Sequence, residues 1–383
     1  MDKKTRRRWV WKASYPPVHL FCTRFRGYSY ETVKEPGPYL LIANHATNFL
    51  DILFIALAVG REPVSYVGSE HLMRSGPAGR LLTWGFDLIP RPKGAAGLSS
   101  VRDILKTLRG GSSVVLFAEG NASWDGRTVP VVKGTGSLVR AAGVPLVTYR
   151  LEGGYLTRPR WSRSPRRGPV RGRVVNVYPP ETLKNLTGDE VNALIDADIR
   201  EDVWERQRRE MIPRKGKRPA EYLERFLYLC PRCRRIGTLK SRGDELTCAC
   251  GAKWRYLDTG FLEPADPFGD LAAWEDWQTE RFAKREYERD PAGEALFSDG
   301  DCALSRIGDG HQETALGTGR LIQTEDAVTC AGHSFALGDI REMDMVRHNI
   351  LLFTTEDGYW QVRAEGRTNL RKYLETWKHY RER

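Results

Sequence analysis

The chain has 383 residues, 40% hydrophobic and 28% charged, which is too long for one ordinary core and predicts two or three domains. No apolar run approaches the roughly 20 residues that a membrane-spanning helix needs, so any membrane contact is expected to be peripheral. Four of the seven cysteines fall within 21 positions and three are scattered. That is not a disulfide framework for so long a chain, and it favours a reducing cytosol.

The formal net charge of +11 is unevenly distributed. Residues 1–220 contain 37 Lys and Arg against 20 Asp and Glu, whereas residues 263–383 contain 15 against 24. So basic a front half indicates a polyanion, an anionic membrane or a phosphorylated substrate as partner. At the N-terminus, basic residues stand beside Trp9, Trp11 and Phe21. This suits either an interfacial membrane anchor or an ordinary helix that packs on its own domain.

Strand-like apolar runs alternate with helical patterns in the first part of the chain. The clearest helix is predicted over Leu98–Gly111, and a longer charged helix over Thr187–Met211. Such alternation predicts an α/β fold, a largely parallel sheet flanked by helices, in a first domain over 1–215. The predicted strands are Tyr39–Ala43, Val64–Val67, Val114–Phe117, Leu146–Tyr149 and Val174–Val177.

Two smaller units are expected to follow the α/β domain. Residues 227–262 hold the four clustered cysteines. Residues 265–383 begin with a helical segment, continue through short alternating β-type runs, and end in an amphipathic helix. The last unit is therefore predicted to be a small β-barrel-like domain closed by a C-terminal helix. It resembles the pleckstrin-homology-like lipid-binding barrels, and its acidic balance equally suits a regulatory or protein-contacting role.

A histidine and a carboxylate occupy the turn that leaves the first predicted strand. The run Asn44-His45-Ala46-Thr47-Asn48-Phe49-Leu50-Asp51 directly follows an apolar stretch. Ligands of α/β sheets collect at the carboxyl ends of the strands, where these side chains would lie. A histidine can take a proton near neutral pH, and a carboxylate can fix its tautomer. An isolated histidine is more often a satisfied core residue, but the strand exit and Asp51 favour catalysis here.

Three further segments at strand ends carry groups that suit a phosphorylated substrate. In the second segment, 85–94, Arg91 and Lys93 stand on a rigid turn, where a guanidinium would grip a phosphate bidentately. Surface solvation is the alternative for Lys93. In the third, 117–123, Gly120 lets the backbone approach a ligand closely, and Glu119 could bond to substrate hydroxyls. A helix cap or a salt bridge is the alternative for Glu119. The fourth segment, 143–149, is another buried strand, for which a core role suffices.

These four segments, in this order and at these separations, resemble the glycerolipid acyltransferase family, which includes lysophosphatidic acid and glycerol-3-phosphate acyltransferases. The resemblance covers roughly residues 20–215 and rests on the order of the motifs more than on any one of them. It implies that His45 is the general base and Asp51 its orienter. It also implies a binding site for the acceptor substrate made of Asn44, Arg91, Lys93, Glu119, Gly120 and Asn121.

One departure from the family concerns the spacing of the catalytic pair. Most relatives have four residues between histidine and aspartate, whereas Ala46–Leu50 makes five here. A helix turns about 100° per residue, so an insertion within regular helix would swing the carboxylate away. The pair can meet only if the extra residue lies in the turn, with Thr47 or Asn48 capping a helix that starts near Phe49.

A second departure is Ala122, which stands where the third segment of most relatives has an arginine. The missing phosphate contact would have to come from Arg91, Lys93, Lys133 or the basic cluster Arg158–Arg173. That cluster is either a solvated loop or a contact for anionic headgroups, worth about 1 kcal/mol per basic residue near such a surface.

The four clustered cysteines have the pattern of a zinc ribbon. Cys230 and Cys233 are followed, after 14 residues, by Cys248 and Cys250. Zn²⁺ prefers four thiolates at tetrahedral corners, and two short knuckles supply them. A redox pair at Cys230 and Cys233 is the main competitor, disfavoured because two more cysteines return at ligand spacing. The zinc would be structural, since no ligand position remains open for catalysis.

Together these patterns predict a peripheral membrane acyltransferase on the cytoplasmic, inner face of a membrane. His45 would deprotonate the acceptor hydroxyl, which attacks the thioester of acyl-CoA or acyl-carrier protein. The preferred acceptor is lysophosphatidic acid, giving phosphatidic acid, with glycerol-3-phosphate as the alternative. A basic zinc-ribbon protein that binds nucleic acid, or a non-catalytic lipid sensor, are rivals of other classes. Nucleic acid is disfavoured because the basic residues gather around the His–Asp segment and the ribbon has few aromatics.

Overall fold

The computed structural model describes residues 3–47, 50–60, 63–69, 87–91, 98–288, 295–308 and 312–382. The chain forms two compact units. The first comprises Met1–Pro92, Gly97–Arg160 and Pro165–Gly216; the second comprises Lys93–Ala96, Trp161–Ser164 and Lys217–Arg383. Within the described part of the chain, no helix is both long and apolar enough to cross a bilayer.

A seven-stranded sheet in the order β1-β7-β6-β2-β5-β3-β4 forms the centre of the first unit. Neighbouring strands pair in parallel except β6 and β7, so the predicted largely parallel sheet is confirmed. The strands are β1 (Tyr28–Tyr30), β2 (Leu40–Ala43), β3 (Ser65–Ser69), β4 (Leu88–Arg91), β5 (Val114–Phe117), β6 (Leu146–Glu152) and β7 (Val170–Tyr178).

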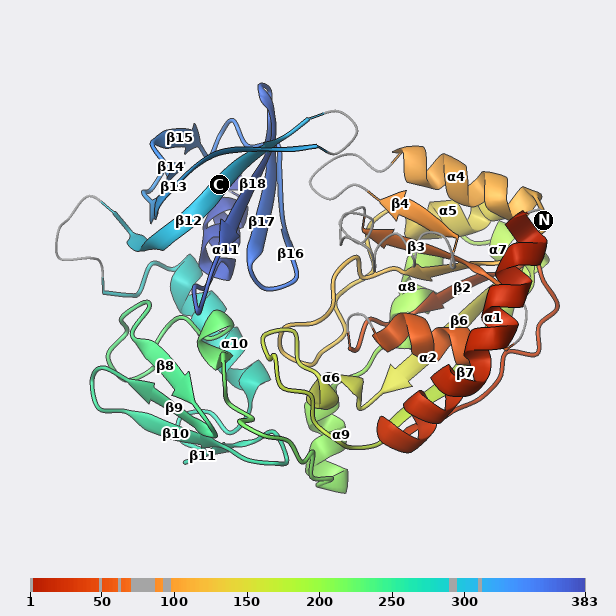
Figure 1. Ribbon diagram of the computed structural model, residues 1–383, viewed down its shortest axis with the longest axis horizontal. Helices are drawn as coiled ribbons and strands as arrows, with labels where there is room; N and C mark the ends of the chain where they lie inside the picture. The colour runs from red at the N-terminus through yellow and green to blue at the C-terminus, as the bar shows by residue number, and fades with distance from the viewer. Residues whose placement is uncertain are drawn as a thin grey trace. The chain divides into compact units, whose positions relative to one another are not determined.

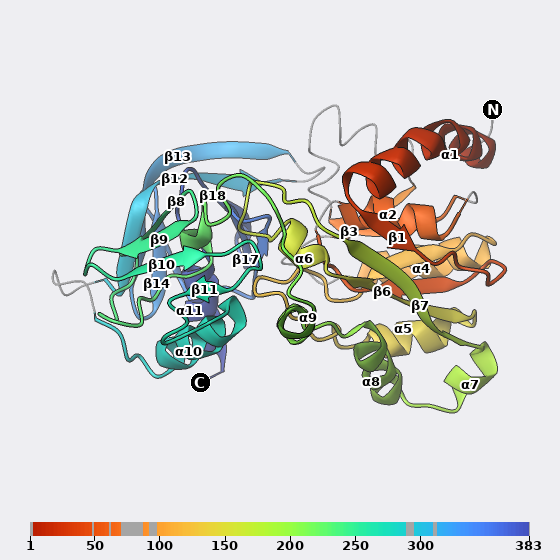
Figure 2. The ribbon, with the colours of Figure 1, turned by 90° about the horizontal axis from the view of Figure 1, so that it is seen from below.

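Helices cover both faces of this sheet, as Figures 1 and 2 show. One face carries α1 (Lys3–Leu20), its π-helical continuation η1 (Phe21–Phe25) and α2 (Leu50–Ala58). The other carries α4 (Leu98–Arg109), α5 (Thr135–Ala142), α7 (Pro180–Lys184) and α8 (Gly188–Ile199). Strand β2 shows how the two faces are filled, because successive side chains of a strand point to opposite sides. Leu41 and Ala43 join the core under α2, and Leu40 and Ile42 join the core under α4 and α8.

Helix α1 is fixed to its own unit by two buried side chains. The guanidinium of Arg7 donates to the carbonyl of Val64 at 2.7 Å and to the carboxylate of Asp87 at 3.1 Å. Four residues on, one helical turn away, the indole of Trp11 donates to the carbonyl of Gly60 at 2.7 Å. The N-terminal segment therefore packs on its domain, whatever its outer side contacts.

The single helix predicted over Thr187–Met211 is wrong, because the structure breaks it into α8 and α9 (Val203–Glu210). The carboxylate of Glu201 accepts the main-chain N–H of Gly153 at 2.7 Å, which draws the chain towards the end of β6. Asp202 then caps α9 by accepting the N–H groups of Trp204 and Glu205. A tertiary contact thus overrides a helical pattern that is continuous in the sequence.

The second unit contains two antiparallel sheets. The four-stranded sheet, in the order β11-β10-β9-β8, adjoins the cysteines. It consists of β8 (Leu239–Arg242), β9 (Glu245–Cys248), β10 (Lys253–Tyr256) and β11 (Leu262–Glu263). The short 3-10 helix η3 (Leu223–Arg225) precedes this sheet, α10 (Leu271–Ala283) follows it, and short α6 (Gly154–Thr157) belongs to the first unit.

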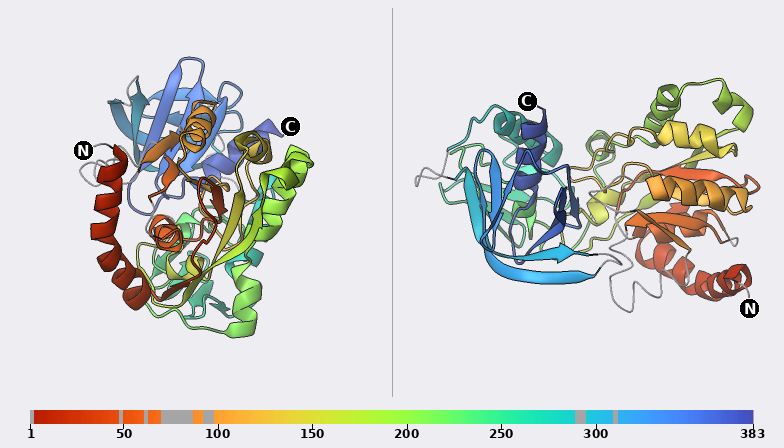
Figure 3. Two further views of the ribbon diagram at one scale, coloured as in Figure 1. Left: turned by 90° about the vertical axis from the view of Figure 1, so that its right-hand side faces the viewer. Right: turned by 90° about the horizontal axis from the view of Figure 1, so that it is seen from above.

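The C-terminal sheet has seven strands in the order β15-β14-β13-β12-β18-β17-β16. Helix α11 (Arg371–Arg381) lies against it, with the hydroxyl of Tyr373 donating to Leu321 and the indole of Trp377 donating to Ile340. Figure 3 shows the long strands curving around this helix. A half-barrel sheet with a terminal helix is confirmed, while the pleckstrin-homology resemblance stays a prediction. The strands are β12 (Phe297–Ile307), β13 (Glu313–Gln323), β14 (Ala327–Cys330), β15 (His333–Ala336), β16 (Glu342–Val346), β17 (Ile350–Thr355) and β18 (Gly358–Ala364).

Candidate active site

The turn that carries His45, here called the catalytic turn after its predicted role, starts at the carboxyl end of a central strand. Strand β2 lies between β6 and β5 and is buried along its whole length, which fixes its end in the sheet. The chain leaves the sheet at Asn44, and α2 begins at Leu50. His45 is therefore held at the edge of the sheet where ligands of parallel α/β folds bind.

His45 and Asp51 meet despite the inserted residue. The His45 Nδ1 atom lies 2.5 Å from an oxygen of Asp51, whose side chain is fully buried in the first turn of α2. The same carboxylate accepts the N–H of Thr47 at 2.9 Å and the Thr47 hydroxyl at 2.5 Å. The extra residue is thus accommodated before the helix, as the spacing required. Thr47 donates to Asp51. Asn48 and Phe49 lie outside the described residues, so the predicted cap at Thr47 or Asn48 stays a prediction.

The imidazole of His45 has one nitrogen occupied and one open. Its ring stacks on Phe117 with the centroids 4.8 Å apart, and 21% of the side chain is exposed. Because Nδ1 faces the Asp51 carboxylate, Nδ1 carries the proton in the neutral ring and Nε2 is the free base. Among the described residues, Nε2 has no hydrogen-bond partner. This arrangement can accept a proton from a substrate hydroxyl.

Glu119 holds the main chain of the catalytic turn. One carboxylate oxygen accepts the main-chain N–H of His45 at 2.5 Å, and the other accepts that of Val129 at 2.6 Å. The side chain is only 4% exposed, and burial raises the pKa of Glu119 to about 8. Both oxygens already bind main-chain donors, so the geometry favours a positioning role over the contact with substrate hydroxyls that the sequence suggests.

Arg91 and Gly120 lie together beside this support. Gly120 has φ of +72°, and Arg91 Nη1 lies 3.2 Å from where a Cβ of residue 120 would be. A side chain at 120 would therefore be strained and would crowd the guanidinium. Arg91 has no hydrogen-bond or ion-pair partner among the residues that the structure describes. Lys93, the other predicted phosphate contact, lies outside the described residues.

Arg160 reaches the third segment from a distant part of the chain. Its guanidinium donates to the carbonyl of Ala122 at 3.1 Å, lies 3.5 Å from the amide oxygen of Asn121, and stacks over Trp124. It belongs to the basic cluster Arg158–Arg173, one of the predicted sources of the phosphate contact that Ala122 cannot make. No local pattern distinguishes Arg160 within that cluster, since the contact is made across 38 residues.

Asn44 and Gly154 connect the catalytic turn to the end of β6. The Asn44 side chain donates to the carbonyl of Leu151 at 2.8 Å and accepts its N–H at 2.6 Å. It is 3% exposed, which favours a structural role over substrate contact. A Cβ on Gly154 would lie 2.7 Å from the Cβ of Ala46 and 2.8 Å from Thr47. Glycine is needed here because the turn packs directly on the backbone.

The four clustered cysteines of the second unit come together at one point. The sulfur atoms of Cys230, Cys233, Cys248 and Cys250 all lie within 4.8 Å of one another. The pairs Cys230–Cys250 and Cys233–Cys248 are 3.9 and 3.7 Å apart. Tetrahedral thiolates at about 2.3 Å from one zinc ion are separated by about 3.8 Å, so this donor set fits a metal ion.

Comparison with known proteins finds a family model that matches part of the first unit. Residues 24–152 match the family model described as Acyltransferase, which identifies an acyltransferase domain within the first unit. The recognition made from the four sequence segments is thereby confirmed. No curated protein matches the chain. Among solved structures, the crystal structure of the 1-acyl-sn-glycerophosphate (LPA) acyltransferase PlsC from Thermotoga maritima matches with 18% identity, a TM-score of 0.41, and coverage of 52% of this chain and 82% of that one.

The raised pKa of Glu119 predicts a pH-dependent contribution to stability. Its value of about 8 in the folded protein exceeds the ordinary 4.5, so the folded protein keeps a proton that the unfolded chain releases. The free energy of unfolding should therefore fall as the pH rises from about 4.5 to about 8, by at most about 1.4 kcal/mol per pH unit. Glu119→Gln removes this titration and leaves one main-chain N–H facing an amide NH₂, a loss of about 1–3 kcal/mol that does not vary with pH.

Urea unfolding at pH 5, 6.5 and 8 measures the difference between wild type and Glu119→Gln. Other buried carboxyl groups such as Glu201, whose pKa burial raises to about 7, titrate in both proteins and cancel in the difference. The advantage of the wild type should shrink with rising pH. Equal pH slopes in the two proteins would contradict the assignment.

Proposed function

We propose that the protein transfers a fatty acyl group from a thioester donor, acyl-CoA or acyl-carrier protein, to the hydroxyl of lysophosphatidic acid. The acyltransferase domain supports the reaction class. The observation that carries the proposal is His45, whose Nδ1 is bonded to buried Asp51 and whose Nε2 is open at the sheet edge. Glycerol-3-phosphate is the alternative acceptor, since it also combines a hydroxyl with a phosphate.

The geometry supports general-base catalysis by His45. Nε2 takes the proton of the acceptor hydroxyl as its oxygen forms a bond to the thioester carbon. The tetrahedral intermediate collapses by breaking the carbon–sulfur bond, and the imidazolium returns the proton to the departing thiolate. Asp51 holds the reactive tautomer and stabilises the imidazolium, while Glu119 fixes the main chain of the turn. The products are the acylated acceptor and the free thiol of the donor.

Arg91 is the proposed contact for the phosphate of the acceptor. Its guanidinium lies next to Gly120, one residue from Glu119, which binds the turn that carries His45. A guanidinium with no other ionic partner can bind a phosphate through two parallel hydrogen bonds. Lys93 remains a proposed second contact on sequence grounds alone.

Acyl transfer measured as thioester consumption tests the proposed reaction. His45→Ala should lower kcat by about 10²–10⁴-fold, because the general base is lost. Asp51→Asn should also lower kcat, since an amide can stabilise neither the required tautomer nor the imidazolium. His333→Ala, an exposed histidine on β15, serves as the matched control and should leave kcat unchanged. Unchanged transfer by His45→Ala would remove the enzyme proposal.

The same assay with a panel of acceptors tests Arg91. For lysophosphatidic acid or glycerol-3-phosphate, Arg91→Gln should raise KM about 10-fold, the loss of one charge-assisted contact. For a monoacylglycerol, which lacks the phosphate, KM should not change. Arg91→Lys keeps the charge but not the bidentate geometry, so its KM for these phosphorylated acceptors should lie between those of the wild type and Arg91→Gln. An equal effect of Arg91→Gln on both kinds of acceptor would exclude the phosphate contact. If no acceptor works and nucleic acid binds with a steep salt dependence, the nucleic-acid rival is correct.

We further propose that the four-cysteine cluster binds one structural zinc ion. All four donors are thiol groups within contact of one another, which matches the preference of zinc and leaves no open coordination position. The zinc would hold the turn with Cys230 and Cys233, which precedes β8, to the hairpin between β9 and β10 with Cys248 and Cys250. Its chemistry would be structural, since zinc of this kind stabilises folds too small to have a core of their own.

Metal analysis of the reduced full-length protein tests the zinc proposal. About one zinc per chain is expected, and Cys233→Ser should lose zinc and unfold at a lower temperature. Cys302→Ser, which changes a buried thiol in the C-terminal sheet, is the matched control and should keep the metal. A metal-free protein with a disulfide between Cys230 and Cys233 would favour the redox alternative.

A peripheral membrane position is proposed from the outer side of the N-terminal helix. The apolar residues Trp9, Leu20, Phe21 and Phe25, here called the N-terminal patch, are 67%, 57%, 42% and 55% exposed. Positive charge lies next to the patch at Arg26, whose pKa is lowered first by burial and then by the nearby charges of Arg158 and Arg167. Apolar side chains among arginines suit the interface of an anionic bilayer.

Sedimentation with lipid vesicles tests this position. Wild type should bind vesicles that contain phosphatidylglycerol more strongly than vesicles of phosphatidylcholine alone, and salt should weaken the binding. Phe21→Ser combined with Phe25→Ser should reduce binding to both. Val177→Ser removes an exposed apolar side chain from β7 and is the matched control. Binding that does not respond to the paired substitution would exclude the N-terminal patch.

A further inference from the structure

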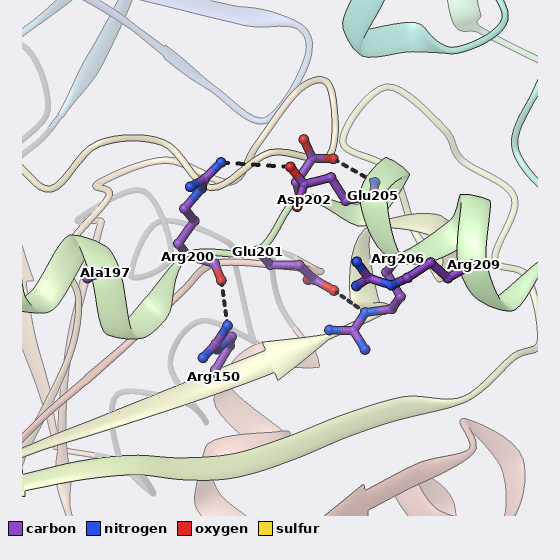
Figure 4. Close-up of a pocket in the computed structure, with 8 residues that line it drawn as sticks. All are labelled: Arg150, Ala197, Arg200, Glu201, Asp202, Glu205, Arg206 and Arg209. Carbon is purple, nitrogen blue, oxygen red and sulfur yellow. Dashed lines mark hydrogen bonds and ion pairs between the residues drawn. The ribbon is translucent and has the colours of Figure 1, made fainter.

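An arginine-lined groove lies on the first unit, away from the residues assigned above. It has a volume of about 220 Å³ and is formed by β6, the end of α8, the connection that follows and α9. Four guanidinium groups border it, those of Arg150, Arg200, Arg206 and Arg209 (Figure 4). Such a concentration of arginines in one hollow needs an explanation, because like charges repel when they are brought together.

The carboxylates of the groove are largely committed to the fold. Glu201 is buried and bonds to the N–H of Gly153 and to Arg206. Asp202 caps α9, accepting the N–H groups of Trp204 and Glu205. Glu205 faces Arg200 at 3.9 Å, and both of these side chains are mostly exposed, so this pair contributes little.

Three of the arginines keep positive charge to offer to a ligand. Arg206 is compensated by ion pairs with Glu152, Glu201 and Glu210. Among the described residues, Arg150 bonds only to the main-chain carbonyl of Arg200, and burial, together with the nearby charge of Arg173, lowers its pKa. Arg209 has no hydrogen-bond or ion-pair partner among the described residues, and Figure 4 shows it without a dashed contact.

The groove and Arg91 lie on opposite sides of the catalytic strand. In the order β7-β6-β2-β5-β3-β4, His45 follows β2, Arg91 ends β4, and Arg150 belongs to β6. The segment 150–154 also connects the groove to the catalytic turn. Asn44 binds Leu151, Glu201 binds Gly153, and Gly154 packs on Ala46, so the segment 150–154 has contacts with both. Two anionic substrates could thus approach the base from the two sides of β2.

We propose that this groove binds the phosphate groups of a coenzyme A thioester, which makes coenzyme A the acyl donor. The inference rests on the proposed acyl transfer and adds the identity of the donor and its site. Guanidinium groups bind phosphate through paired hydrogen bonds, which suits separate arginines on a small hollow. A carrier protein suits it less, because the arginines line a hollow of only about 220 Å³, which a phosphate group can enter and the surface of a folded protein cannot.

Binding of adenosine 3′,5′-bisphosphate, the phosphate-bearing part of coenzyme A, tests the groove directly by calorimetry on the full chain. Arg200→Gln and Arg209→Gln, both exposed, should each weaken binding about 10-fold, which corresponds to about 1.4 kcal/mol. Arg208→Gln is the matched control, because it removes an exposed arginine of the same helix that does not line the groove. It should bind like the wild type.

A kinetic comparison separates this inference from the proposed function. With acyl-CoA as donor, Arg200→Gln and Arg209→Gln should each raise the KM for acyl-CoA about 10-fold and leave kcat unchanged. With the acyl thioester of pantetheine, which lacks the phosphates, they should behave like the wild type. If the KM for acyl-CoA is equal in wild type and variants, the groove does not bind coenzyme A, while the proposed acyl transfer still stands. No transfer by the wild type from any donor overturns the function, while the calorimetry still decides the groove. Variants impaired only with acyl-carrier protein as donor, with unchanged bisphosphate binding, would assign the groove to the carrier and contradict the proposal.

Discussion

The conformation of the turn that carries His45 depends on the hydrogen bonds of the buried Asp51 carboxylate. It is a negative charge without solvent, at the start of α2, and it is compensated by the imidazole of His45 and by the N–H and hydroxyl of Thr47. A helix N-terminus favours such a charge, and the donors satisfy its oxygens. One side chain therefore sets the conformation of the turn, the start of the helix and the tautomer of the base.

A second carboxylate, that of Glu119, holds the same turn by its main chain. It comes from the end of β5, next to β2, so two neighbouring strands determine where His45 stands. On the other side of β2, Asn44 binds Leu151 of β6, the second neighbour of this strand. The main chain around His45 is therefore held from both sides of its own strand. Such preorganisation would suit the proton transfer proposed for His45, whose side chain is 21% exposed.

Much of this architecture could be predicted because the strands of a parallel sheet are buried on both faces and read as short apolar runs. The run Val114–Phe117 matches β5 residue for residue. Contacts between distant residues are the part that local patterns miss. The break before α9 depends on Glu201 reaching Gly153, and the place of Arg160 depends on a carbonyl 38 residues away. Glu119 was noticed for its charge, but its partners are main-chain groups that no motif encodes.

The attachment of α1 has a geometric consequence. Because Arg7 and Trp11 tie one side of the helix to the domain one turn apart, the helix cannot roll about its axis. The aromatic residues on its outer side therefore keep a fixed heading relative to His45. A lipid layer that captures them would hold the enzyme at a constant tilt. Each acceptor molecule would then reach His45 from the membrane in the same orientation, because the enzyme would not rotate relative to the bilayer.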